Sequence, residues 1–203
     1  MFYTEGCYGV CMAFETLVTV SWWMILPLSF VGSLLHFTFD WTGHNRLAAI
    51  FSAVNESYWE HIKIAIWPVV LLQIILFAAG GYQYPAFLPA ATIALYSLPI
   101  SMIGIVFLYK SITKRNILWL DIATFFVIIA VAQTLFVLVL EQLDPSSVTV
   151  VFAVVFLGGL LVAFLRFTLR PPSEPDVFID PITEKYGLHA HPDYEILKKT
   201  RYE

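Results

Sequence analysis

The chain has 203 residues, of which 59% are hydrophobic, 16% aromatic and only 13% charged. Soluble globular domains carry roughly 25% charged residues, so this composition excludes a soluble enzyme and indicates an integral membrane protein in a lipid bilayer. The formal net charge of -4, without a continuous basic face, excludes a nucleic-acid partner.

Five apolar runs approach the ~20 residues that a helix needs to cross ~30 Å of hydrocarbon. They cover residues 16–39, 62–82, 87–109, 117–140 and 148–167. The first run is too long for the apolar part of a signal peptide, so we expect it to remain in place. Short connections between the later runs make consecutive helices antiparallel neighbours. The predicted fold is all-α: residues 1–170 form a polytopic membrane domain with five transmembrane helices in one compact bundle.

Three local features refine this prediction. Residues 47–54 are apolar, but eight helical residues cover only ~12 Å, so we expect this piece to lie in the interface or against the bundle. Pro68 predicts a kink in the second span. Cys7 and Cys11 would share a helix face. We expect them to be free thiols or packing residues, with a disulfide as the alternative.

The basic residues predict the orientation. If the N-terminus is outside, every one of the 11 Lys and Arg residues falls in an inner segment. Inner loops of membrane proteins are enriched in these residues. We therefore expect a multi-pass protein of the cell membrane with its N-terminus outside and its C-terminus inside.

Residues 171–203 differ in composition, with several prolines and mixed charges. We expect an extended cytoplasmic tail with one short helix near residues 194–199. His189 and His191 are interpreted as incidental residues of a solvated tail, and a metal shared by the two is the alternative. A further hypothesis is that the Asp180-Pro181 turn folds back as a lid over the polar site described next.

Ionisable residues gather at the inner ends of the first two spans. His36 and Asp40 are four apart, Glu56 and Glu60 repeat that spacing, and His61 follows directly. Residues four apart lie on one face of a helix. Ionisable groups at the mouth of a membrane bundle are costly unless paired or hydrated, so they mark a candidate functional site. His44, Asn55 and Asp121 are additional candidates at the same depth.

The first interpretation of this cluster is a metal site. His36, Asp40, Glu56, Glu60 and His61 offer ligands for a divalent ion such as Zn²⁺ or Mn²⁺, or for iron. The metal would activate water against a small-molecule or lipid substrate from the inner leaflet or the cytoplasm. Glu56 and His61 are the predicted catalytic residues, with Glu56 as base or ligand. The spacing matches neither HExxH nor the ExxH of di-iron helices.

Other interpretations stay open. Ser57 to Glu60 fits the capping box S-x-x-E, which gives Glu60 a structural role, and Asn55 could cap instead. The whole cluster could be an ion-pair network of a structural or accessory subunit. It could also titrate in a proton-linked solute carrier, favoured by a water-filled channel that reaches Gln73 and Gln133. Mid-membrane positions carry no charge, which favours a one-sided enzyme or binding site, although a homo-oligomer could complete a pathway.

Two motifs carry a resemblance to a known family. The first is N-E-S-x-W-E-H at residues 55–61, and the second is P-P-x-x-P followed by D-P-x-T-x-x-Y-G within residues 171–187. Together they resemble a prokaryotic family of small polytopic membrane proteins of unknown function. The resemblance implies a fold and a membrane location but no activity. Residues 189–203 lie beyond the part that it covers.

Overall fold

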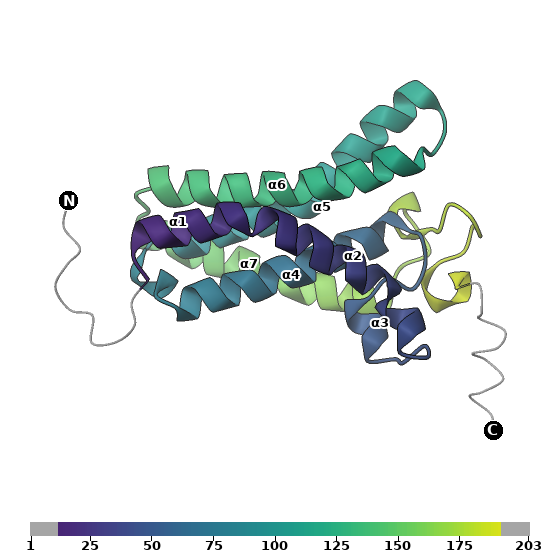
Figure 1. Cartoon of the computed structure of the whole chain (residues 1–203), viewed down its shortest axis with the longest axis horizontal. Helices are drawn as coiled ribbons and strands as arrows, with labels where there is room; N and C mark the ends of the chain where they lie inside the picture. The colour runs from purple at the N-terminus through teal and green to yellow at the C-terminus, as the bar shows by residue number, and fades with distance from the viewer. Residues whose placement is uncertain (1–11, 192–203) are drawn as a thin grey trace.

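The computed structural model describes residues 12–191, and most of these residues are helical (Figure 1). Extended pairing within these residues is limited to one bridge, between Ile179 and Tyr186. Cys7, Cys11 and the expected helix at 194–199 lie outside the described residues. The α-helices are α1 (Phe14–Trp23), α2 (Ile25–Trp41), α3 (Ala48–Phe51), α4 (Tyr58–Ala78), α5 (Phe87–Thr113), α6 (Leu118–Gln142) and α7 (Ser147–Leu169).

Four helices, α4 to α7, are each long and apolar enough to cross a membrane. A fifth span follows if α1 and α2 together form one, because the two pass the same test as a pair bent by 47°. The chain is therefore an all-α protein with four or five candidate membrane spans. The later runs match their predicted positions to within four residues. The largest differences are α4, which begins and ends four residues before the predicted 62–82, and α5, which ends four residues after the predicted 109.

The expected single helix over residues 16–39 is broken at Met24, the residue between α1 and α2. Pro27 lies in the first turn of α2 and explains the position of the break. Its ring lacks an N–H and clashes with the carbonyl of the residue four positions earlier, which is Trp23. The sequence analysis missed this break, because Pro27 lies within an otherwise continuous apolar run.

The bundle core lies between α2, α4, α5 and α6, and α5 packs most extensively against α6. Gly32 allows α2 to approach its neighbours closely. A Cβ at this position would lie 2.6 Å from the Phe125 ring and 2.9 Å from the Ile64 carbonyl oxygen. By contrast, α7 buries only Ala153 and Phe164, so most of its apolar side chains face outwards.

The two ends of the bundle differ (Figure 1). At one end, the start of α1 lies near the end of α6. At the other end, α3 and residues 171–191 gather around the end of α2 and the start of α4. Residues 52–57 lie between α3 and α4 and are mostly buried. The predicted site residues belong to these segments, except for His44 in the connection between α2 and α3 and Asp121 in the first turn of α6.

The prediction of an extended tail was wrong for residues 171–191. Asp176–Phe178 and Gly187–Ala190 form short 3-10 helices, and Phe178 is buried against the Trp59 and Phe167 rings. Its ring centroid lies 5.1 Å from that of Trp59. Apolar burial and a folded turn around Asp180 therefore hold this segment on the bundle, in place of the solvated chain that its prolines suggested.

Candidate functional site

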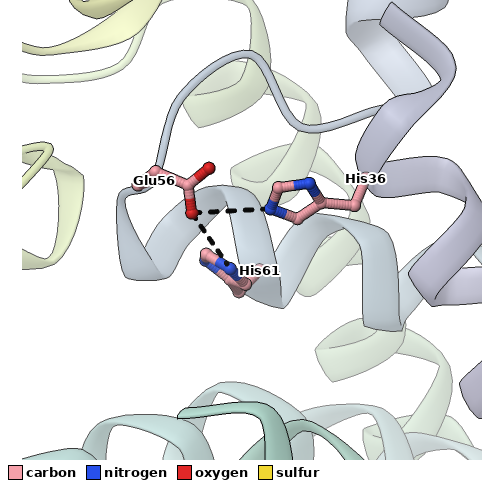
Figure 2. Close-up of side chains that lie close together, drawn as sticks. All are labelled: His36, Glu56 and His61. Atoms are coloured by element: carbon pink, nitrogen blue, oxygen red, sulfur yellow. Dashed lines mark ion pairs between the residues drawn. The ribbon is translucent and has the colours of Figure 1, made fainter. Parts of the chain in front are cut away.

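Three of the predicted residues converge at this end of the bundle (Figure 2). The Nε2 atom of His36 lies 3.5 Å from Oε2 of Glu56, and the Nε2 atom of His61 lies 3.8 Å from the same oxygen. One ligand atom from each residue lies within 4.8 Å of the other two. The imidazole rings of His36 and His61 are 5.3 Å apart between centroids. All three side chains are partly exposed, so the cluster is accessible.

Each residue of this cluster comes from a different structural setting. His36 projects from α2, His61 from the first turn of α4, and Glu56 from the loop just before α4. The His61 Nδ1 atom lies 3.0 Å from the carbonyl oxygen of Ser57. A carbonyl only accepts, so Nδ1 carries the proton and donates it. In the neutral ring, the Nε2 atom that faces Glu56 then carries a lone pair. In the imidazolium ring, it carries a second proton and is a donor.

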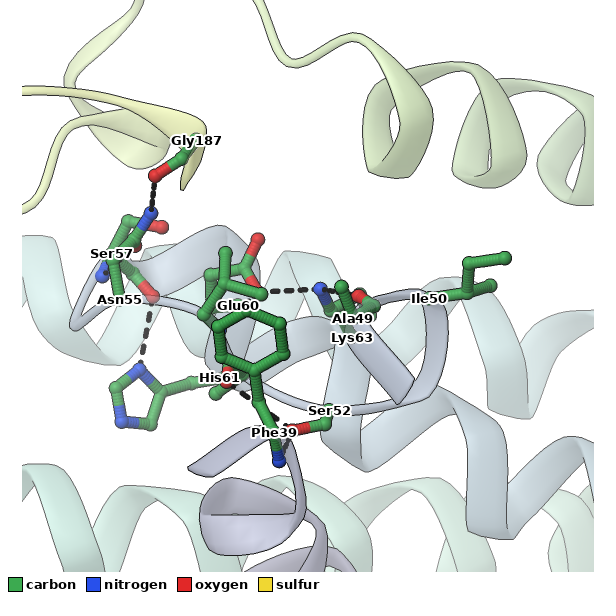
Figure 3. A network of polar contacts seen from close by, with 12 residues as sticks. Phe39, Ala49, Ile50, Ser52, Asn55, Ser57, Glu60, His61, Lys63 and Gly187 are labelled. Carbon is green, nitrogen blue, oxygen red and sulfur yellow. Dashed lines mark hydrogen bonds and ion pairs between the residues drawn. The ribbon is translucent and has the colours of Figure 1, made fainter. Parts of the chain in front are cut away.

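The loop that carries Glu56 is held by side chains along one face of α4 (Figure 3). Lys63 Nζ donates to the Ala49 carbonyl at 2.8 Å. One turn further along, Trp67 Nε1 donates to the Ile50 carbonyl at 2.8 Å. At the α2 side, the hydroxyl oxygen of Ser52 accepts from the Phe39 backbone N–H at 2.7 Å. These contacts hold residues 49–52 against α2 and α4.

Glu60 belongs to this support and lies outside the His36–Glu56–His61 cluster. Its carboxylate accepts from the Val54 backbone N–H at 3.0 Å and pairs with Lys63 Nζ at 2.5 Å. Only 4% of Glu60 and 1% of Lys63 are exposed. Buried carboxylates in proteins are paired, and here both contacts are made by Oε2 of Glu60. The structure therefore places Glu60 in a structural role rather than among the predicted metal ligands.

The capping-box prediction was wrong in detail. Ser57 is the N-cap of α4, but its hydroxyl makes no capping hydrogen bond. Instead, Oδ1 of Asn55 accepts from the Ser57 backbone N–H at 2.8 Å. The Ser57 N–H donates to Asn55, and the Glu60 carboxylate accepts from the Val54 N–H instead. Asn55 does not cap α4 either, because its contact with the Ser57 N–H is an Asx-turn that precedes the helix.

The folded tail contacts the same loop from the other side. Asn55 Nδ2 donates to the Gly187 carbonyl at 2.9 Å, and the Glu56 backbone N–H donates to Oδ2 of Asp180 at 3.3 Å. The second oxygen of Asp180 accepts from the backbone N–H groups of Ile182 and Thr183 at 2.7 and 3.2 Å. Asp180 is only 2% exposed. A buried tail carboxylate therefore orients the backbone of Glu56.

The Glu56 carboxyl is perturbed by its neighbours. Its pKa is held below the usual range chiefly by the hydrogen-bonding contact with His36. The positive charges of protonated His36 and His61 act in the same direction, whereas partial burial acts to raise the pKa. Because 44% of the side chain is exposed, solvent screens these interactions. Glu56 is thus a carboxylate anion at neutral pH, facing two imidazoles.

A pocket of about 660 Å³ opens beside the cluster. This volume is within the range of small-molecule sites, roughly 300–1,000 Å³. The polar part of its lining, here called the polar end, includes His36, Glu56, His61 and Asp121, and most of the remaining lining, the apolar end, is aliphatic or aromatic. The apolar lining comes from α2, α4, α5 and α6: Phe37, Ile64, Met102, Leu118, Ile122, Phe125 and Phe126. The tail closes one side with Pro181 and Ile182.

The model of one protein family, described as a family of unknown function (DUF6512), matches residues 12–188. The chain belongs to this family. The match covers the whole helical bundle and residues 171–188 of the folded tail, so the bundle and the His36–Glu56–His61 cluster are features of a DUF6512 chain. His191 lies three residues beyond the matched range. Neither the comparison with curated proteins nor the comparison with solved structures gives a match.

The remaining predicted residues of this DUF6512 chain lie around the cluster. Asp40 is on α2 but belongs to a second group, with His44 and His191. Asp121 lines the large pocket and accepts a hydrogen bond from the Tyr109 hydroxyl. The sequence analysis gave Lys63 no site role. It offered His191 as a metal ligand only in an alternative shared with His189, and it assigned the Asp180-Pro181 turn to a lid over the polar site. Lys63 lies three residues after Glu60, a spacing that indicates an ion pair on a helix and could have revealed it.

Proposed function

We propose that this membrane protein binds a divalent transition metal through His36, Glu56 and His61 and hydrolyses an amphipathic substrate in the adjoining pocket. One observation carries this proposal: two imidazole Nε2 atoms converge on a single carboxylate oxygen, at 3.5 and 3.8 Å. With Nδ1 of His61 bound to the Ser57 carbonyl, its Nε2 lone pair is directed at an anion. A cation between the two, either a metal or a proton, removes that repulsion.

The donor set and its spacing favour a metal. Two imidazoles and one carboxylate make up the protein ligands of many catalytic zinc sites, which leave one position open. Ligand atoms bound to one Zn²⁺ at ~2.0–2.2 Å lie roughly 3.4 Å apart in a tetrahedron. The His–Glu separations of 3.5 and 3.8 Å are close to that value. The Ser57 carbonyl is the outer partner that orients His61, as metal-binding histidines require.

The pocket defines the class of substrate. Its polar end lies at the proposed metal, and its apolar end is formed by side chains of four helices. A molecule with a hydrolysable polar group and a long acyl chain satisfies both ends. A metal at His36, Glu56 and His61 would supply an activated water at neutral pH. The chain itself would hold the acyl group against Phe125 and Met102 and keep the reacting bond at the polar end.

The basic residues support a site that faces the cytoplasm of the cell membrane. Lys110, Lys114 and Arg115 lie at the α5–α6 connection, and this connection is at the same end of the bundle as the cluster (Figure 1). Basic residues concentrate on the cytoplasmic side of membrane proteins. Under this proposal the substrate enters from the inner leaflet or from the cytoplasm.

A proton-linked carrier is the second candidate, and one observation favours it. The side-chain amides of Gln73 and Gln133 are buried, at 5% and 0% exposure, and have no hydrogen-bond partner within residues 12–191. Such groups could hold a polar solute or water. The residues lining the large pocket do not include either glutamine, so the pocket stops short of them. For this reason we place the hydrolytic proposal first.

The test compares long-chain and short-chain nitrophenyl esters as substrates of the detergent-purified protein. We expect hydrolysis that chelation abolishes and added Zn²⁺ or Mn²⁺ restores, with the long-chain ester preferred because the apolar end of the pocket holds its chain. His36→Ala and His61→Ala should both lose the metal-dependent rate. His189→Ala is the matched control, since His189 is an exposed histidine outside the cluster.

Two results would contradict the proposal. One is hydrolysis that is unaffected by chelation or by both cluster substitutions. The other is the absence of metal-dependent hydrolysis of either ester by a protein that has bound the metal. In that second case, metal-free protein reconstituted in vesicles should be examined for proton-driven solute uptake, with Gln73→Leu and Gln133→Leu as the informative variants.

A further inference from the structure

A second group of metal-ligating side chains lies at the end of α2, apart from the site of the proposed reaction. Asp40, His44 and His191 each offer a ligand atom within 4.8 Å of the other two. The Nε2 atoms of His44 and His191 approach the same oxygen, Oδ1 of Asp40, at 3.3 and 3.1 Å. The two rings are in edge contact, with centroids 4.8 Å apart. As in the first cluster, two imidazoles converge on one carboxylate oxygen.

The chain reversal after α2 brings His44 back towards Asp40. Gly43 and His44 both have left-handed backbone conformations, with φ of 65° and 63°. This conformation is uncommon for a residue with a side chain. Two backbone bonds hold it: Gly43 N–H donates to the Asp40 carbonyl at 3.0 Å, and His44 N–H donates to the Phe39 carbonyl at 2.9 Å. The helix end is thus built so that the His44 ring lies against the last turn of α2.

His191 reaches the group from the far end of the described chain. Its backbone N–H donates to the Leu188 carbonyl at 3.1 Å, and Ala190 beside it is fully buried. Only 8% of His191 is exposed. The Phe39 ring packs against both histidine rings, with its centroid 5.2 Å from each of theirs. His191 is therefore held in a fixed place opposite Asp40, which is 151 positions earlier in the chain.

The separations match a metal more closely than they do in the first cluster. Zn²⁺ ligands in a tetrahedron lie roughly 3.4 Å apart when each is bound at ~2.0–2.2 Å. The two His–Asp separations are 3.3 and 3.1 Å. Nitrogen and oxygen donors of this kind suit Zn²⁺, Ni²⁺ or Cu²⁺ rather than Ca²⁺ or Mg²⁺. The Asp40 side chain is 60% exposed, which leaves room for water to complete the coordination.

We propose that Asp40, His44 and His191 form a second divalent-metal site, best suited to Zn²⁺, and that metal binding fastens the tail to the end of α2. A smaller pocket of about 290 Å³ lies between this group and the first cluster. Its lining includes Asp40 and His191 from the second group, His36 and Glu56 from the first, and Thr183 from the tail. A bound metal therefore closes the tail over the polar end of the site.

The experiment uses the full-length protein in detergent, with the first cluster removed by the double substitution His36→Ala/His61→Ala. Because this background lacks the ligands of the proposed reaction, the result does not depend on that proposal. Co²⁺ is the probe, since its visible absorption reports tetrahedral coordination, and Zn²⁺ is then added to displace it. We expect one Co²⁺ per chain, and His191→Ala should weaken its binding by at least about 10–100-fold.

His189→Ala is the matched control, because it removes an exposed histidine two residues away. It should bind Co²⁺ as the parent does. Asp40→Asn is the second test variant and should also lose the metal. Protease cleavage within residues 171–191 gives an independent readout. Zn²⁺ should slow that cleavage in the parent and in His189→Ala but not in His191→Ala.

Three outcomes would overturn the second site. In the first, the parent His36→Ala/His61→Ala protein shows a thermal unfolding transition, and so is folded, but binds no Co²⁺. His191→Ala could bind Co²⁺ as tightly as the parent, or His189→Ala could lose Co²⁺ as fully as His191→Ala. Zn²⁺ protection of the tail that persists in His191→Ala would overturn the fastening role in the same way.

Discussion

Glu56 and Glu60 lie only four residues apart, but the structure puts them in opposite environments. Glu60 is 4% exposed, and its Oε2 atom contacts both Lys63 Nζ and the Val54 N–H. The Glu56 side chain is 44% exposed and faces two imidazoles at the polar end of a large pocket. Glu60 thus supports the loop at residues 52–57, whereas Glu56 projects from this loop towards the pocket. The difference teaches that charge type and spacing do not separate a supporting residue from a functional one, whereas the partners do.

Breaking the Glu60–Lys63 pair should have the largest effect on the free energy of unfolding. Lys63→Met leaves the Glu60 charge buried without its partner, and we expect a loss of about 3–5 kcal/mol in the free energy of unfolding. Unfolding of the purified protein in detergent measures it. The double variant Glu60→Gln/Lys63→Met removes both charges and should recover most of the loss. A loss below about 1 kcal/mol in Lys63→Met would contradict the supporting role.

A substitution at Glu56 should change metal affinity rather than stability. Glu56→Gln should weaken Zn²⁺ binding at the first cluster by about 100-fold, which equals ~2.8 kcal/mol. The same change should alter the free energy of unfolding by no more than about 0.5 kcal/mol, because the side chain is half exposed. Competition with a chelator of known affinity measures the first quantity, in a His191→Ala background that removes the second group. Unchanged Zn²⁺ affinity would remove Glu56 from the site.

Asn55 connects the two sides, since it satisfies the Ser57 N–H and binds the tail at Gly187. Asn55→Ala should cost about 1–2 kcal/mol, because one buried donor and one buried acceptor lose their partners. It should also speed protease cleavage within residues 171–191. Asn55→Asp keeps the acceptor for Ser57 but not the donor for Gly187, so it should release the tail at a smaller cost. Equal cleavage rates in all three proteins would contradict the connection.

The smallest expected effect is the pH dependence of stability that comes from Glu56. The pKa of Glu56 is lower in the folded protein than in the unfolded chain, so its charge stabilises the fold above the unfolded pKa of about 4.5. That stabilisation is lost as the pH falls from there through the folded pKa. The difference in melting temperature between wild type and Glu56→Gln should therefore shrink as the pH is lowered below about 4. A difference that stays constant across this range would show that Glu56 gains nothing from His36.

The sequence predicts the helices of the bundle well, because the length of each apolar run determines whether a helix can span the membrane. Four spans follow directly from runs of about 20 residues, and the turn at Gly43 follows from its conformational freedom. The break at Met24 depends on Pro27 acting on the carbonyl of Trp23, and hydrophobicity alone does not report it.

The site is only partly predictable for a different reason. The i, i+4 spacing placed His36 and Asp40 on one face, but their side chains contact different groups, because Glu56 meets one and His191 meets the other. The His191–Asp40 contact joins residues 151 positions apart. It requires the tail to fold on Asp180 and Phe178, a tertiary packing that local pattern does not encode. Proline content favoured a solvated tail, and buried contacts outweighed it.

The most direct test of the first cluster is the Zn²⁺ content of three proteins that share a His191→Ala background, measured after Zn²⁺ loading and removal of excess metal. The three are the parent, Glu56→Gln and Glu60→Gln/Lys63→Met. We predict stoichiometric Zn²⁺ in the parent and in the double variant, and none in Glu56→Gln. Zn²⁺ retained by Glu56→Gln at the level of the parent would contradict the account, as would a parent that folds and holds no Zn²⁺.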